Sequence, residues 1–180
     1  LDWFTCNKLP RVNKINLTYA LTSTGTVRSE YTIVRKDTDE YYLISAGALT
    51  TYDQDYLVKN AQDKYEEFGY IEIHDVTSQF GAFAIAGPKS RELLQKIVTA
   101  LEPENQFSNE NFPWLSCKDI ELGMIPTLAI RVAYTGELGW ELHHPVEFQN
   151  RLFELLLAAG QEFNLKLVGA RAQNWLRQEK

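Results

Sequence analysis

The sequence predicts an α+β fold, with mixed and antiparallel sheets and packed helices. Apolar residues alternate with polar ones over several short segments, and over other segments they recur at helical spacing. These segments do not follow one another as regular βαβ units, which argues against a parallel α/β sheet. With 180 residues, of which 44% are hydrophobic, the chain is long enough to bury a core.

The first third of the chain has the pattern of a three-stranded meander. Residues 15–21 and 26–35 alternate on either side of Thr24-Gly25, a candidate turn because glycine tolerates positive φ. Residues 40–45 follow a polar turn as the third strand. In the second strand the odd-numbered residues share one face and the even-numbered residues the other, which places Glu30 in mid-strand beside Thr32.

Helical and strand patterns are mixed in the rest of the chain. Apolar residues recur at helical spacing up to Gly69, a candidate helix stop, and Pro88 occupies the tolerated first position of a later helix. A polar loop at 100–116 has a length typical of functional or mobile loops. The expected elements are a helix at 48–68, strands at 71–76 and 80–86, a helix at 88–99, strands at 118–122, 126–134 and 138–143, a helix at 147–160, a strand at 165–168 and a last helix at 169–180.

Charge and cysteine content exclude several classes of protein. The 18 basic and 24 acidic residues give a net charge of −6, so the chain lacks the basic field that nucleic acids or anionic membranes attract. Cys6 and Cys117 form no C-x-x-C pair, which argues against a disulfide framework or zinc ribbon and favours a reducing compartment. No apolar run approaches the roughly 18 residues of a membrane span. We expect neither a nucleic-acid nor a membrane partner.

The signatures of common catalytic sites are missing. No G-x-G-x-x-G occurs, so this chain shows no dinucleotide or flavin fingerprint of its own. The run at 87–90 does not fit a phosphate-binding loop, because Pro88 removes a backbone N–H that would hold phosphate. His143 and His144 are adjacent in a predicted strand, so they point to opposite faces and cannot chelate one metal. We expect them at the surface or a sheet edge, and we predict no metal site.

Two carboxylates stand out. Glu30 occupies a mid-strand position, where an acid is disfavoured unless it faces water or a polar ligand. Glu141 follows two glycines, Gly136 and Gly139, that would let the backbone approach a flat ligand, on which Tyr134 could stack while Glu141 accepts two parallel N–H bonds. The residues leave alternatives open: a solvated sheet face for Glu30, and a bulged hairpin with a surface acid for Glu141.

Several runs in register over nearly the whole chain resemble the folate-binding aminomethyltransferase family of the glycine cleavage T-protein. The runs at 86–90, 134–141 and 176–180 resemble the family as a whole. Those at 24–34 and 158–162 resemble its dimethylglycine and sarcosine dehydrogenase branch, in the C-terminal half of those proteins. The resemblance implies a multi-lobed α+β domain, here a fragment cut at both ends with two possible lobes at about 1–100 and 101–180.

The resemblance also implies a tetrahydrofolate site and roles for four residues. An acid matching Glu30 would hold the folate N10, steady a cationic iminium and take up a proton as 5,10-methylenetetrahydrofolate forms. Tyr134 and Glu141 would pack against and hydrogen-bond the pterin, and Thr32 would line the pocket. FAD would belong to an upstream domain of the same chain, where a methylated amine is oxidised. The expected location is the bacterial cytoplasm or the mitochondrial matrix.

Three departures from the family pattern keep other functions open. Glu30 stands where many members have Asp, Ser45 where they have Asn, and Gln173-Asn174 where they have Arg-Asp, which removes a cation that could anchor folate. One alternative is a free-standing aminomethyl- or methyltransferase. Another is a regulatory homologue that keeps the fold without the chemistry.

Overall fold

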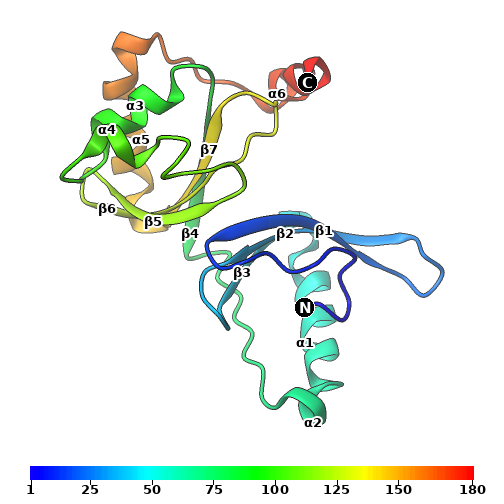
Figure 1. The fold of residues 1–180 in the computed structure, drawn as a ribbon. Helices are drawn as coiled ribbons and strands as arrows, with labels where there is room; N and C mark the ends of the chain where they lie inside the picture. Colours follow the sequence, from blue (N-terminus) through cyan, green and yellow to red (C-terminus); the bar gives the residue numbers. More distant parts are fainter. The chain divides into compact units, whose positions relative to one another are not determined.

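The computed structural model describes residues 1–180 as two compact units, Leu1–Ser78 and Gln79–Lys180. The division lies earlier in the chain than the one near residue 100 that the sequence suggested. Each unit combines an antiparallel sheet with helices, so the predicted α+β class is confirmed (Figure 1). No helix of the structure has the length and apolar character that crossing a membrane would require.

Unit 1 is the predicted three-stranded meander with a helix on one face. Strands β1 (Lys14–Leu21), β2 (Val27–Arg35) and β3 (Tyr41–Ile44) pair antiparallel in chain order. Gly25 turns the chain between β1 and β2 with φ of +84°, a value that favours glycine. Buried Ala20, Tyr31 and Ile33 form the core of this unit. The helical elements are the 3-10 helix η1 (Gly47–Leu49), α1 (Thr50–Gln62) and α2 (Tyr65–Phe68).

Two expectations for the end of unit 1 are wrong. The helix expected at 48–68 is interrupted between Gln62 and Tyr65, and its second part ends at Gly69, whose φ is +77°. The strand expected at 71–76 does not form, because this segment pairs with neither sheet. Alternating apolar residues are therefore insufficient, since a strand also needs a neighbour for its backbone N–H and C=O groups.

Unit 2 is a four-stranded antiparallel sheet with helices, in the order β4-β7-β6-β5. Its strands are β4 (Phe80–Ala86), β5 (Cys117–Leu122), β6 (Ile125–Ile130) and β7 (Gly139–Pro145). Its α-helices are α3 (Ser90–Ile97), α4 (Pro103–Gln106), α5 (Gln149–Gly160) and α6 (Ala170–Leu176). Short 3-10 helices are η2 (Val146–Phe148), η3 (Gln161–Phe163) and η4 (Arg177–Glu179). Figure 1 shows α3 and α5 on the same side of this sheet.

Trp140 lies at the centre of the unit 2 core. It is fully buried on β7, and the rings of Phe107 and Phe112 meet it edge-on at centroid distances of 5.3 and 6.1 Å. The buried Arg131, which directly follows β6, donates hydrogen bonds to the Phe112 carbonyl and to Asn109 Oδ1. These bonds join the 100–116 loop to the end of β6. Phe107 and Phe112 of this loop are thus part of the core, whereas many of the other side chains in the loop are exposed.

The expectation for the paired histidines is wrong, since both are buried. His144 is fully buried, stacks on Phe83 with ring centroids 5.1 Å apart, and bonds Gln149 Oε1 through Nε2 at 2.8 Å. His143 is 6% exposed. They lie on β7, which β4 and β6 flank on its two sides, so neither is at a sheet edge.

The strand expected at 165–168 is also absent. Asn164 adopts a left-handed conformation with φ of 56°, and the Leu165 N–H bonds the Gly160 carbonyl as α5 ends. The Leu165 side chain packs against the unit 2 core, whereas Leu167 and Val168 are exposed. Leu165 therefore packs at the end of the helix, and the rest of the short apolar run joins no sheet.

Gly139 is needed for the pairing of β7 with β4. A Cβ at this position would lie 2.6 Å from the Ile85 carbonyl oxygen, a backbone atom of the neighbouring strand. We expect Gly139→Ala to destabilise unit 2 by about 1–3 kcal/mol, because the strands must move apart. Urea unfolding would measure this. Gly169→Ala, where a Cβ meets nothing within 4 Å, is the control and should lower stability clearly less. Equal losses of stability in the two variants would contradict the close approach of Gly139 to β4.

Candidate functional site

Glu30 and Thr32 share the face of the first sheet that is opposite to the Tyr31 core. They alternate along β2 with Ser29, Tyr31 and Ile33, which are all buried. Glu30 is exposed and Thr32 is half-buried. The strand period therefore presents the Glu30 carboxylate to solvent from the middle of β2, at a position that pairs with β1.

Tyr19 is the cross-strand partner of Glu30. The two residues are directly opposite in the β1–β2 register, so their side chains lie on the same face. The Glu30 carboxylate raises the pKa of the Tyr19 hydroxyl, first through a side-chain hydrogen bond and second through its negative charge. Sequence reasoning did not single out Tyr19, because its register with Glu30 depends on the length of the turn at Gly25.

Tyr134 lies in the turn between β6 and β7, since β6 ends at Ile130 rather than at the expected residue 134. Its ring is 44% exposed, and its hydroxyl is 3.1 Å from Asn174 Oδ1 on α6. The Arg177 guanidinium lies over the ring, 5.0 Å from the centroid. Although Gln173 lacks the cation expected in this helix, Arg177 supplies one beside Tyr134, a contact that the sequence pattern did not reveal.

Glu141 lies on β7, on the face opposite to Trp140 and Leu142. Its carboxylate is 36% exposed and is 3.4 Å from the Nε2 atom of His143, which follows it on the same face. The carboxylate is thus held on one side and open on the other. The close approach that glycines allow in this run is used by the protein itself, because Gly139 packs against β4.

The four candidate residues fall into two pairs. Glu30 and Thr32 belong to unit 1, and Tyr134 and Glu141 belong to unit 2. Ser45 is half-buried directly after β3, and Gln173 is half-buried on α6. The structure contains no group of three or more His, Cys, Asp or Glu side chains that could hold a metal ion.

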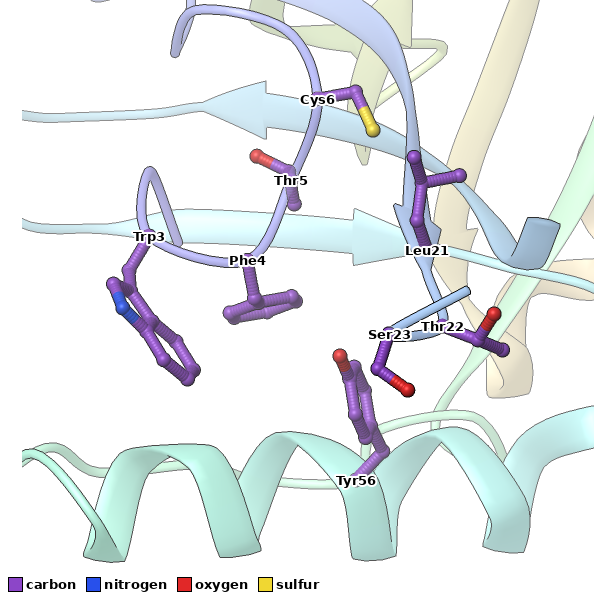
Figure 2. Close-up of a pocket in the computed structure, with 8 residues that line it drawn as sticks. All are labelled: Trp3, Phe4, Thr5, Cys6, Leu21, Thr22, Ser23 and Tyr56. Atoms are coloured by element: carbon purple, nitrogen blue, oxygen red, sulfur yellow. The ribbon is translucent and has the colours of Figure 1, made fainter. Parts of the chain in front are cut away.

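Unit 1 also contains a hollow that is separate from Glu30. It has a volume of about 330 Å³ and is lined by residues 3–6, residues 21–23 and Tyr56 (Figure 2). The Phe4 and Tyr56 rings meet edge-on, with centroids 5.6 Å apart, and both pack on the Tyr31 core. Because Glu30 points away from that core, a ligand in this hollow would not touch its carboxylate.

Solved structures with the same fold include one of an aminomethyltransferase. The glycine cleavage system aminomethyltransferase T from Bartonella henselae matches 95% of this chain and 42% of its own, with a TM-score of 0.70 and 20% identity. At that identity the match supports the fold alone. It shows the fold to which the two sheets belong.

The sequence comparisons define the family. The model of the GCVT N-terminal domain matches residues 1–180, and the chain belongs to this family. It is 34% identical over 181 residues to human mitochondrial dimethylglycine dehydrogenase, covering 100% of this chain and 20% of the relative. It is 32% identical over 142 residues to human mitochondrial sarcosine dehydrogenase, covering 79% of this chain and 15% of the relative. The chain thus spans a fifth or less of these two relatives.

Proposed function

We propose that this chain is the tetrahydrofolate-binding portion of a dimethylglycine- or sarcosine-type dehydrogenase, and that it converts an iminium carbon to 5,10-methylenetetrahydrofolate. The observation that carries the proposal is the exposed Glu30 carboxylate in the middle of β2, beside Tyr19 and Thr32, in a chain of the GCVT N-terminal domain family. Oxidation of the methylated amine by FAD belongs, in this proposal, to another domain of the longer protein, in a bacterial cytoplasm or a mitochondrial matrix.

Tetrahydrofolate supplies two nucleophilic nitrogens, N5 and N10. In the balanced reaction each nitrogen exchanges an N–H bond for a bond to the iminium carbon, and the amine leaves as its ammonium ion carrying both hydrogens. Glu30 would accept a hydrogen bond from N10–H, offset the iminium charge, receive the proton that N10 releases and pass it to the departing amine. An open carboxylate whose neighbour Tyr19 is already a donor suits this role.

Glu141 and Tyr134 would recognise the pterin. A carboxylate that is 36% exposed can accept two parallel N–H bonds from the pterin amino group and ring nitrogen. The half-exposed Tyr134 ring offers a surface for packing, and the Arg177 guanidinium beside it suits the anionic glutamate tail of folate. The net charge of −6 does not attract that tail, so local contacts of this kind would have to supply the affinity.

The direct test is calorimetric titration of the intact protein with tetrahydrofolate, together with a thermal melt. Binding should release heat and raise the melting temperature, because a ligand that binds only the native state stabilises it. No heat and no shift at saturating tetrahydrofolate would overturn the proposal and favour the non-catalytic homologue.

We expect Glu141→Gln to weaken tetrahydrofolate binding by about 10-fold or more, because the amide loses the charge and one of two acceptor positions. The dissociation constant from calorimetry measures this. Glu137→Gln makes the same chemical change at an exposed position four residues earlier and should leave the dissociation constant unaltered. Equal affinities of the two variants would contradict the role of Glu141.

A further inference from the structure

A buried carboxylate on α1 holds both neighbours of Glu30. Ser29 and Tyr31 each donate a hydrogen bond to Asp53 Oδ1, at 2.5 and 3.1 Å. All three residues are buried, and Asp53 is only 2% exposed. Burial raises the pKa of the Tyr31 hydroxyl to about 12, so it remains protonated and continues to donate.

This cluster is costly for a protein that needs only packing. A carboxylate removed from water loses hydration, and Asp53 has no salt bridge to compensate; its second oxygen, Oδ2, is buried without a partner. Apolar side chains of similar size would fill the same space without that cost. The polar cluster instead fixes the orientation of the Ser29 and Tyr31 side chains, because hydrogen bonds fix the geometry of the groups that make them.

The orientation of Ser29 and Tyr31 also sets that of Glu30, because successive side chains of a strand point to opposite faces. With Ser29 and Tyr31 both fixed to α1, the residue between them must project from the opposite face of β2. That residue is Glu30. We propose that Asp53 is a positioning residue: by anchoring Ser29 and Tyr31 to α1, it fixes the segment of β2 that aims the Glu30 carboxylate.

This inference rests on the proposed function, in which Glu30 touches the reacting atoms. Asp53 acts only through Glu30, on the far side of the sheet from it, and makes no contact with substrate. Its loss should therefore lower the rate of carbon transfer and leave tetrahydrofolate affinity, assigned to Tyr134 and Glu141, unchanged.

The test replaces the whole cluster by apolar groups in the intact protein. The triple variant Ser29→Ala, Tyr31→Phe, Asp53→Leu keeps the volume and leaves no hydroxyl unpaired. We expect the maximal rate of methylenetetrahydrofolate formation to fall about 10-fold, since small misplacements of a reacting group are costly, while the dissociation constant of tetrahydrofolate stays within about 2-fold of wild type. The single variant Asp53→Asn retains an acceptor oxygen, so its rate should be closer to that of wild type than to that of the triple variant. Asp55→Asn, an exposed change on the same helix, should have no effect.

A second comparison separates positioning from general damage. In a Glu30→Gln background the triple change should cause no further loss of rate, because both act through one carboxylate. A wild-type rate in the triple variant would overturn the inference. So would an equal fall in rate when the triple change is made in wild type and in the Glu30→Gln variant. Should the triple variant not fold, Tyr31→Phe alone should lower the rate about 3-fold, and an unchanged rate would overturn it. Failure of the wild-type protein to bind tetrahydrofolate would instead refute the proposed function.

Discussion

Replacing Glu30 with Gln should lower the rate of methylenetetrahydrofolate formation about 100-fold or more, the range that general acid–base catalysis typically contributes. Gln has nearly the same shape as Glu, so β2 and its register with β1 should persist. It carries no negative charge to offset an iminium, however, and it cannot take up the proton that N10 releases. The loss should appear in the maximal rate, because the interaction is made with the reacting centre.

The measurement uses the intact protein with a methylated amine that it oxidises, and follows methylenetetrahydrofolate directly. Tetrahydrofolate binding, measured by calorimetry, should change by much less than the rate. Glu40→Gln is the matched control: it is also exposed in unit 1, but it lies in the turn before β3 and pairs with Lys36. If Glu30→Gln and Glu40→Gln form methylenetetrahydrofolate at the same rate, Glu30 is a solvated surface acid, which is the alternative that its sequence position left open.

Glu30 also shows what the sequence could predict. A strand of nine residues fixes which side chains share a face, so the position of Glu30 opposite to Tyr31 followed from the alternation. Its exposure did not follow, because Val34 on the same face is fully buried. The same rule predicted opposite faces for His143 and His144. It failed for their burial, because burial depends on which strands become neighbours of β7 and on what packs over the sheet.

The contacts around the candidate residues were less accessible to sequence reasoning. Arg177 lies over Tyr134 although the two are far apart in the chain, and Asp53 bonds Ser29 and Tyr31 across a helix–sheet contact. The signal for Asp53 was weak: an acid three residues before Tyr56, next to the apolar stripe of a predicted helix. The segment at 71–76 failed for the opposite reason, since its local pattern fitted a strand but no partner strand was available to it.

Trp140→Ala should destabilise unit 2 by about 3–5 kcal/mol, the typical cost of removing a buried aromatic side chain. The ring is fully buried and is met edge-on by Phe107 and Phe112, so its loss removes the surface on which the 100–116 loop packs. Chemical denaturation of the intact protein, followed by hydrogen exchange of unit 2 amides, measures the effect where it arises. Trp114→Ala, in the same loop but 51% exposed, should change stability by less than about 0.5 kcal/mol.

A third variant tests whether volume or hydrogen bonding governs this position. The Trp140 Nε1 atom is buried without a hydrogen-bond partner, so Trp140→Phe removes an unpaired donor as well as part of the ring. It should therefore cost clearly less than Trp140→Ala. A loss as large as that of the alanine variant would mean that the full indole is required, and a neutral Trp140→Ala would contradict the placement of Trp140 at the centre of the core. Because Glu141 follows directly on β7, destabilising this strand should also weaken tetrahydrofolate binding, which Trp114→Ala should leave intact.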